Sequence, residues 1–257
     1  MENLLRKKIA DKARPIGIFA DTGSADVVEC IGKAGFDYVI IDNEHSPVEA
    51  ETSAELIRAS ELCGMTPLCR VREISRPAVL KLLDVGAKGL IVPNVKTVEE
   101  VRDLVSYSKY SPVGNRGFAP SRKDGWGCDI NMNVADTMKY HNEQVMLIPQ
   151  CETVEALGCV EEIAGTEGVD GIFIGPFDLS ISMGMPGDFQ NPVFKAALRR
   201  IIEACHAAGK FCILFAGTKD AAVEGFGMGA DVIAYSLDAV VIIEGFKERL
   251  AAIRAEL

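Results

Sequence analysis

The chain has 257 residues, of which 48% are hydrophobic and 25% are charged, a balance that indicates a folded globular protein and excludes a disordered one. Its 37 acidic and 27 basic residues give a net charge of −10 without a basic cluster, which disfavours nucleic acid or an anionic membrane as partner. No signal peptide stands out and no apolar run approaches the ~20 residues of a membrane span, so a cytoplasmic protein is expected.

Short apolar runs, predicted to be strands, alternate with amphipathic segments, predicted to be helices. The predicted strands cover 16–20, 38–42, 66–70, 88–93, 145–150, 169–175, 211–215 and 231–235. The predicted helices cover 24–33, 47–63, 75–84, a segment from 97, 153–164, 191–208, 218–228 and a closing segment to about 255. Eight such units predict an α/β fold, a single (β/α)8 TIM barrel spanning 1–257, although the length alone would also allow two domains.

The alternation of predicted strands and helices is interrupted at 110–142, a segment rich in glycine, proline and charged residues. Loops of this length inside a compact domain are usually functional, so a role in substrate choice is considered. The eight cysteines are scattered and form no Cys-x-x-Cys pair, which predicts reduced, mostly buried thiols rather than disulfides or a zinc cluster.

The second predicted strand ends abruptly in polar residues. Asp42, Glu44 and His45 follow its apolar run, and Pro47, with Ser46 as N-cap, predicts that a helix begins there. Because α/β enzymes place reacting groups at the carboxyl ends of strands, His45 is a candidate functional residue. The alternative is that His45 only caps or hydrogen-bonds the turn.

Residues after the other strands would face the same pocket of a barrel. They are Asp21, Arg70, Gln150, Glu152 and Asp178. Glu152 and Asp178 follow consecutive strands, so their carboxylates can reach one hard divalent cation, and the absence of histidine favours Mg²⁺ or Mn²⁺ over Zn²⁺. Either carboxylate alone would more often be an ordinary helix cap.

Arg70 is the only arginine directly at a predicted strand end, where its guanidinium could hold a carboxylate or a developing enolate oxygen. A surface salt bridge is the alternative. The backbone of Gly175, Pro176 and Phe177, near a helix start, could cradle a carboxylate. Asp84 stands at a helix end and, from sequence alone, is interpreted as a solvated carboxylate.

Several motifs in succession resemble the HpcH/HpaI aldolase family, the metal-dependent class II pyruvate aldolases. The resemblance covers nearly the whole chain, and the order of the motifs makes it more specific than any one of them. The motifs lie at 36–45, 67–72, 82–87, 91–95, 114–117, 149–153 and 171–180.

The resemblance implies a barrel of the phosphoenolpyruvate/pyruvate type in which His45 is the catalytic base, Asp84 raises its basicity and Arg70 stabilises the transition state. It implies a divalent cation, Mg²⁺ or Mn²⁺ with Co²⁺ as a further option. The implied metal ligands are Glu152 and Asp178, and the implied substrate contacts are Gln150, Arg70, Gly175, Pro176 and Phe177.

Two positions depart from the family pattern. The family usually has glycine where Asn43 stands and a small residue at Phe177, which predicts a narrower pyruvate side. The 116–127 loop also lacks the family's run of small residues and arginine, so the sequence leaves the acceptor aldehyde open.

The residues favour a carbon–carbon lyase that reversibly cleaves a 4-hydroxy-2-oxo acid to pyruvate and an aldehyde. The cation and Arg70 would stabilise the pyruvate enolate, while His45, directly or through a water, would move the proton of the C4 hydroxyl. A Schiff-base aldolase needs a lysine at a strand's carboxyl end, but Lys88 and Lys210 precede their strands, and Lys96, in a loop, is a poor candidate.

Two other functions are weighed. An acyl-CoA lyase of the citrate-lyase β type would need room for a nucleotide, which the short loops disfavour, and a catalytically silent 2-oxo-acid-binding protein would not need all these groups. The metal, the stereoselectivity and the pathway, in aromatic-compound or sugar-acid catabolism, stay open.

The resemblance also implies a homo-oligomer, a hexamer built as a trimer of dimers that exchange the C-terminal helix. That helix carries apolar residues that could support the exchange: Val240, Val241, Ile242, Phe246 and Leu250.

Overall fold

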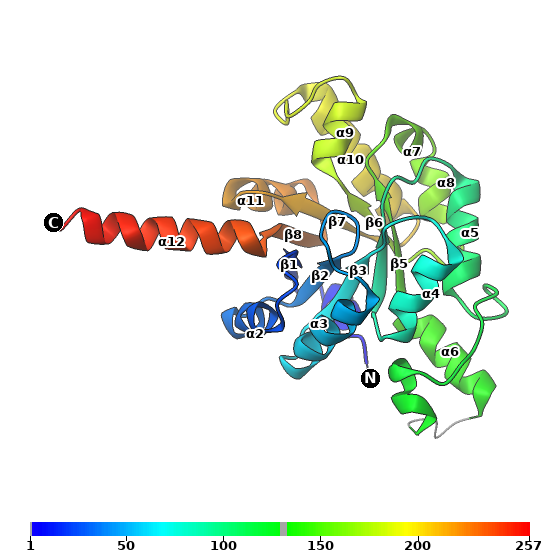
Figure 1. The fold of residues 1–257 in the computed structure, drawn as a ribbon. Helices are drawn as coiled ribbons and strands as arrows, with labels where there is room; N and C mark the ends of the chain where they lie inside the picture. The colour runs from blue at the N-terminus through cyan, green and yellow to red at the C-terminus, as the bar shows by residue number, and fades with distance from the viewer. Residues whose placement is uncertain (1, 129–132) are drawn as a thin grey trace.

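The computed structural model of the chain describes residues 2–128 and 133–257, in which eight parallel strands form a closed barrel (Figure 1). Each strand pairs with the next, and β8 pairs with β1, so the predicted (β/α)8 barrel is confirmed. The strands are β1 (Ile16–Ala20), β2 (Tyr38–Asp42), β3 (Thr66–Arg70), β4 (Gly89–Val92), β5 (Met146–Cys151), β6 (Gly171–Ile174), β7 (Phe211–Ala216) and β8 (Val232–Leu237).

Helices surround the barrel, and the short helix α1 closes its amino-terminal end with the fully buried side chain of Leu5. The helices are α1 (Leu4–Ala10), α2 (Ala25–Ala34), α3 (Ala50–Leu62), α4 (Arg76–Asp84), α5 (Val98–Ser108), the 3-10 helix η1 (Arg122–Gly127), α6 (Val134–Gln144), α7 (Val154–Gly158), α8 (Val160–Gly165), α9 (Pro176–Ser182), α10 (Pro192–Ala207), α11 (Lys219–Met228) and α12 (Asp238–Arg254).

The strands are buried on both faces, which explains their continuous apolar sequences. In β2, Ile40 packs inside the barrel with Leu68 and Phe173, whereas Val39 and Ile41 pack between the strands and the helices. This two-layered core holds the carboxyl ends of the strands at one edge of a rigid frame.

The structure corrects two predicted helices. The helix after β2 begins at Ala50 rather than at Pro47, because the Ser46 hydroxyl donates to the Asp42 carbonyl and accepts the Val48 N–H at 3.2 Å, which forms a tight turn instead of a cap. The helix predicted over 153–164 is divided at Cys159 into α7 and α8.

The 110–142 segment contains more regular structure than predicted, namely η1 and α6, while 129–132 lie outside the described residues. The segment connects α5 to β5 and therefore lies at the amino-terminal end of the barrel (Figure 1). There Arg122 donates to the Val85 carbonyl at 3.1 Å and to Glu61 at 2.5 Å. Its described part thus does not approach the strands' carboxyl ends in its own chain, against the expectation of a direct role in substrate choice.

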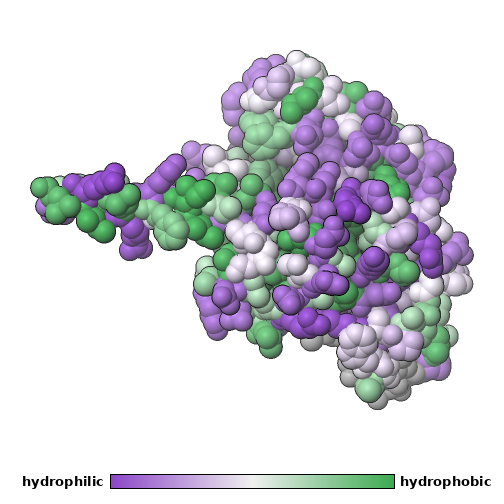
Figure 2. All heavy atoms as spheres, viewed as in Figure 1, coloured by the Kyte–Doolittle hydropathy of each residue, from purple (hydrophilic) through white to green (hydrophobic). Residues whose placement is uncertain are grey.

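Helix α12 projects from the barrel rather than covering it (Figure 1). Apolar side chains gather along the projection (Figure 2), including Phe246, which is 71% exposed, and Leu250, whereas Ile242 is half-buried. Within the described ranges, no helix is long and apolar enough to cross a membrane. All eight cysteines are unpaired, as predicted, but only four are buried, and Cys30 and Cys128 are exposed.

Candidate active site

A cavity of about 200 Å³ lies at the carboxyl ends of the strands, and every strand except β4 contributes a lining residue directly or through the turn after it. Most of the residues that the sequence places at strand ends line this cavity. Among its lining residues are Asp21, Asp42, His45, Arg70, Gln150 and Asp178, together with residues 175–177.

Arg70 is held by a buried carboxylate. Its Nε and Nη2 donate to the two oxygens of Asp42 at 2.8 and 2.6 Å, and its Nη1 lies 3.3 Å from Glu44. Its guanidinium also lies over the Phe19 ring, 4.8 Å from the centroid. Burial disfavours the charge, but the bonds to Asp42 outweigh it and raise the pKa of Arg70. Arg70 is therefore a fixed cation in the cavity, not a surface salt bridge.

His45 lies in the turn after β2, where the Asp42 carboxylate organises the backbone. That carboxylate accepts the N–H of Glu44 at 3.0 Å and of His45 at 3.3 Å. The His45 ring is largely exposed, and its Nε2 lies 3.7 Å from Glu44. Burial raises the pKa of Glu44 despite Arg70 and His45 nearby. The imidazole thus faces the cavity with a carboxylate beside it.

Glu152 is buried beside the cavity and fixed by neighbours on three elements. One oxygen accepts the Asn94 N–H at 2.5 Å, and the other accepts the Gln150 amide. A Cβ at Gly175 would lie 2.8 Å from Gln150 Nε2 and 3.0 Å from the Glu152 carboxylate, so a side chain there would displace these two groups. Burial raises the pKa of Glu152, and the charge of Asp178 raises it further.

The donor set fits a hard divalent cation. Gln150 Oε1 is buried and has no hydrogen-bond partner among the described residues, and Asp178 faces the same cavity. Carboxylate and amide oxygens are the ligands that Mg²⁺ and Mn²⁺ prefer. The carboxyl groups around the cavity outnumber its basic side chains, which are Arg70 and His45. The carboxyl groups are those of Asp21, Asp42, Glu44, Glu152 and Asp178.

Three contacts that build the site have no clear signal in the sequence. The sequence places Asp42 at a strand end but does not indicate that it pairs with Arg70. Asn94 acts through its backbone at φ 53°, a conformation that asparagine tolerates better than most residues, so the Pro-Asn pair after β4 was the available signal. Asp238, at the start of α12, accepts the Asp21 N–H at 3.0 Å, and no sequence pattern connects residues so far apart.

The two residues that depart from the family pattern have different surroundings. Asn43 does not line the cavity; its side-chain oxygen accepts the Ser53 hydroxyl at 3.0 Å, so it faces α3. Phe177 does line the cavity, and its ring packs edge-on against Phe215 and against Phe189, with centroids 5.9 and 5.0 Å away.

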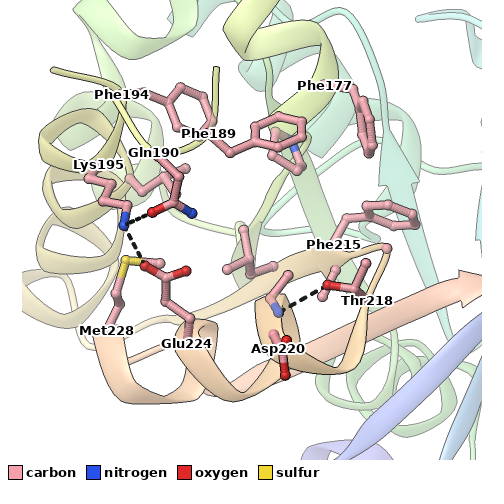
Figure 3. A pocket seen from close by; sticks show the side chains of 16 residues that line it. Phe177, Phe189, Gln190, Phe194, Lys195, Phe215, Thr218, Asp220, Glu224 and Met228 are labelled. Carbon is pink, nitrogen blue, oxygen red and sulfur yellow. Dashed lines mark hydrogen bonds and ion pairs between the residues drawn. The ribbon is translucent and has the colours of Figure 1, made fainter. Parts of the chain in front are cut away.

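Phe177 and Phe215, with Pro176, also border a second cavity of about 280 Å³ between α10 and α11 (Figure 3). This cavity is mainly aromatic and aliphatic. At its rim Lys195 Nζ lies 2.8 Å from Glu224 and donates to Gln190 at 2.6 Å (Figure 3).

Asp84 is the one predicted site residue that the structure separates from the others. It ends α4 at the amino-terminal end of the barrel, where Arg116 donates to it at 2.7 Å. It therefore does not contact His45 of its own chain. Among the described residues, no lysine lines the cavity, and Lys88 lies at the amino-terminal end, 3.9 Å from Glu61.

One cysteine belongs to a cluster of metal-ligand types, formed by His206, Cys212 and Asp231. Asp231 already accepts the His206 ring nitrogen at 3.1 Å and the Cys212 N–H at 2.9 Å. The cluster lies at the amino-terminal ends of β7 and β8, away from the cavity.

Comparison with known proteins gives consistent matches. Residues 15–244 match the family described as HpcH/HpaI aldolase/citrate lyase. The 2-keto-3-deoxy-L-rhamnonate aldolase of Escherichia coli (strain K12) is 30% identical over 257 residues, covering 99% of this chain and 94% of that protein. A solved HpcH/HpaI family protein from Burkholderia cenocepacia J2315 is 31% identical with a TM-score of 0.90, covering 98% and 99% of the two chains. The citrate synthase SbnG is 30% identical with a TM-score of 0.88, covering 98% of each chain.

Proposed function

The chain belongs to the HpcH/HpaI aldolase/citrate lyase family of class II, metal-dependent aldolases, and from this premise we propose that it reversibly cleaves 4-hydroxy-2-oxo acids to pyruvate and an aldehyde. The proposal rests on one observation: the Arg70–Asp42 pair, His45 and Asp178 line one cavity, and the buried Glu152 lies beside it, bonded to the lining residue Gln150. Its substrates are small molecules, and we propose Mg²⁺ or Mn²⁺ as the cation.

Each residue has a distinct part in the proposed reaction. Glu152 and Asp178 would hold the cation, which supplies Lewis acidity toward the 2-oxo group. Gln150 and the backbone of residues 175–177 would contact the 2-oxo acid. His45 would take the C4 hydroxyl proton as the C3–C4 bond breaks and the aldehyde forms, with Glu44 stabilising the imidazolium. The bond electrons pass to the C2 oxygen, where Arg70 would stabilise the enolate before C3 is protonated.

We further propose that the whole chain acts as one barrel domain in a hexamer, which is a trimer of dimers that exchange α12. The exposed apolar residues of this helix support the proposal, because a face of this kind usually marks a protein interface. In such an assembly Asp84 could serve only a His45 of another copy. Light scattering tests the oligomer, and a monomer would contradict it.

A pyruvate and aldehyde panel, run after chelation and again after Mg²⁺ or Mn²⁺ is restored, tests the reaction. We expect aldol formation and oxaloacetate decarboxylation, both of which pass through the pyruvate enolate, only with the cation. Full activity in EDTA, or neither reaction with any cation, would overturn the proposal. Acyl-CoA cleavage in place of aldol chemistry would point to a lyase of the citrate-lyase β type.

A further inference from the structure

Asp21 is a cavity residue that the proposed mechanism does not use. It follows β1, and its backbone is fixed by the buried carboxylate of Asp238, which accepts its N–H at 3.0 Å. The same carboxylate accepts the N–H and the hydroxyl of Thr22 at 3.2 and 2.6 Å and the N–H of Ala239 at 2.8 Å. With four donors, Asp238 holds the end of β1 in one position.

In the side chain of Asp21, in contrast, the oxygen Oδ1 is buried and accepts no hydrogen bond from the described residues. The cavity wall also includes the apolar side chains of Phe19 and Leu237. Burial raises the pKa of Asp21 to about 6, and the charges of Asp42 and Asp238 add to this effect. An unsatisfied buried acceptor is costly, so a donor from a ligand would be favoured here.

Two buried oxygens of the cavity are without partners, and they belong to opposite sides of the barrel. Gln150 Oε1 is on β5, next to the carboxyls of Glu152 and Asp178, whereas Asp21 Oδ1 follows β1. A substrate whose 2-oxo acid end is held on the β5 and β6 side would extend its other end toward β1. Asp21 would then meet the aldehyde portion.

We propose that Asp21 binds the acceptor aldehyde by accepting a hydrogen bond from its hydroxyl group, so that the enzyme prefers hydroxylated aldehydes and disfavours anionic ones. The inference rests on the proposed aldolase function. Arg70 is already paired with Asp42 and Glu44 and is assigned to the enolate, so it does not provide a further positive charge for a carboxylate on the aldehyde. A hydroxyl needs no counter-charge and can donate directly to Oδ1.

The test compares aldehydes that differ only in a hydroxyl group, namely glycolaldehyde with acetaldehyde and lactaldehyde with propanal, and adds glyoxylate as the anion. For the wild-type enzyme we expect kcat/KM to be at least about tenfold higher for the hydroxylated member of each pair. Asp21→Leu should reduce this ratio about tenfold, because it removes the acceptor. A ratio within one variant cancels any general loss of activity.

Asp21→Asn separates the hydrogen bond from the charge. Its amide oxygen still accepts a bond, so the hydroxyl preference should persist while glyoxylate becomes a relatively better acceptor. Asp26→Asn, an exposed acid on α2, is the matched control and should change neither ratio. Equal hydroxyl preference in wild type and Asp21→Leu would overturn the proposal, as would a wild-type preference for apolar aldehydes, which would point instead to the aromatic cavity between α10 and α11.

Oxaloacetate decarboxylation involves no aldehyde. It therefore distinguishes failure of the role of Asp21 from failure of the proposed aldolase function. If the wild type decarboxylates oxaloacetate and forms aldol products but ignores the hydroxyl, only the role of Asp21 is wrong. If neither reaction occurs with any cation, the proposed function fails, and the inference about Asp21 fails with it.

Discussion

The two ends of the barrel differ in how their buried charged groups are paired. At the carboxyl ends of the strands the buried groups are mainly acids: burial raises the pKa of Glu44 and Glu152, and raises that of Asp21 to about 6. Arg70 is the one guanidinium among them, and Asp42 occupies it. This end therefore carries negative charge that the surrounding side chains do not fully compensate.

At the amino-terminal end, buried and half-buried cations are paired with acids of the chain itself. Lys109 Nζ donates to Asp170 at 3.0 Å and to the carbonyls of Asn142 and Val145 at 3.1 and 2.6 Å. Arg6 donates to the same carboxylate at 2.6 Å. Burial lowers the pKa of Lys109, against the effect of Asp170.

The difference separates function from stability. Groups compensated within the chain stabilise the fold, whereas an excess of carboxyls and unpartnered oxygens in a cavity favours a bound cation and substrate. We therefore expect substitutions at the carboxyl end to affect binding and rate, and substitutions at the amino-terminal end to affect stability.

The largest expected effect is that of Glu152→Gln. It keeps the shape but removes a charged ligand, so cation-dependent activity should fall by roughly 10³-fold or more, corresponding to several kcal/mol of lost Lewis-acid stabilisation. Mn²⁺ binding, followed by paramagnetic resonance, should weaken in parallel, while the melting temperature in EDTA should not fall. Glu155→Gln, an exposed acid on α7, is the control. Normal Mn²⁺ affinity in Glu152→Gln would contradict the assignment.

Next in size are two variants that should separate base from enolate stabiliser. Arg70→Ala should slow both aldol cleavage and oxaloacetate decarboxylation by roughly 10²–10³-fold, because both need the enolate. His45→Ala should slow cleavage by about 10²–10⁴-fold and largely spare decarboxylation. The exposed Arg72→Ala serves as control. If His45→Ala and Arg70→Ala depress both reactions by the same factor, the division of roles is wrong.

Lys109→Met tests the amino-terminal end. It removes a cation whose side chain is 3% exposed and leaves Asp170 and two carbonyls short of a donor. We expect the free energy of unfolding, from urea titration, to fall by about 3 kcal/mol while kcat at 25 °C is retained. The exposed Lys139→Met should change neither quantity. A loss of kcat without a loss of stability would break the comparison.

His141, at the same end, should make the free energy of unfolding depend on pH. Burial, with the charges of Lys123, Arg116 and Lys88 and against that of Asp124, lowers its pKa from 6.5 to about 4. The unfolded chain therefore binds this proton more readily, so the stabilisation present above pH 6.5 is lost as the pH falls toward 4, by up to about 3 kcal/mol.

His141→Gln should remove that part of the pH dependence. Urea unfolding of wild type and variant at pH 7.5, 6.5, 5.5 and 4.5 should give stability curves that converge as the pH falls. Parallel curves would show that His141 is not the group responsible.

The barrel and most of the site followed from the sequence because their signals are local. Strands buried on both faces read as apolar runs, and a polar residue directly after a strand must lie at the barrel's carboxyl end, which located His45, Arg70 and Gln150. Contacts between distant segments left no such signal. The bonds from Asp21 to Asp238 and from Asn94 to Glu152 join residues 217 and 58 positions apart, and in both the donor is a backbone N–H.

The role of Asp84 is the prediction that best tests the separation of the two ends. The family resemblance connects this residue to His45, yet it lies at the amino-terminal end and bonds to Arg116. Both statements hold only if Asp84 acts on the His45 of another copy. Asp84→Asn should then lower the pKa of the acidic limb of the kcat/KM profile and reduce activity by about tenfold, as loss of a supporting hydrogen-bond partner typically does.

Mixed oligomers identify where Asp84 acts. If oligomers assembled from His45→Ala and Asp84→Asn chains contain sites with wild-type His45 beside wild-type Asp84, their activity should exceed the mean of the two parents. The control is Asp103→Asn, which changes an exposed acid on α5. Oligomers that mix Asp103→Asn with His45→Ala chains should show only the mean activity of the two parents. If the pH profile of Asp84→Asn is unchanged, Asp84 takes no part in the active site. It would then belong, with Lys109 and His141, to the groups that stabilise the amino-terminal end.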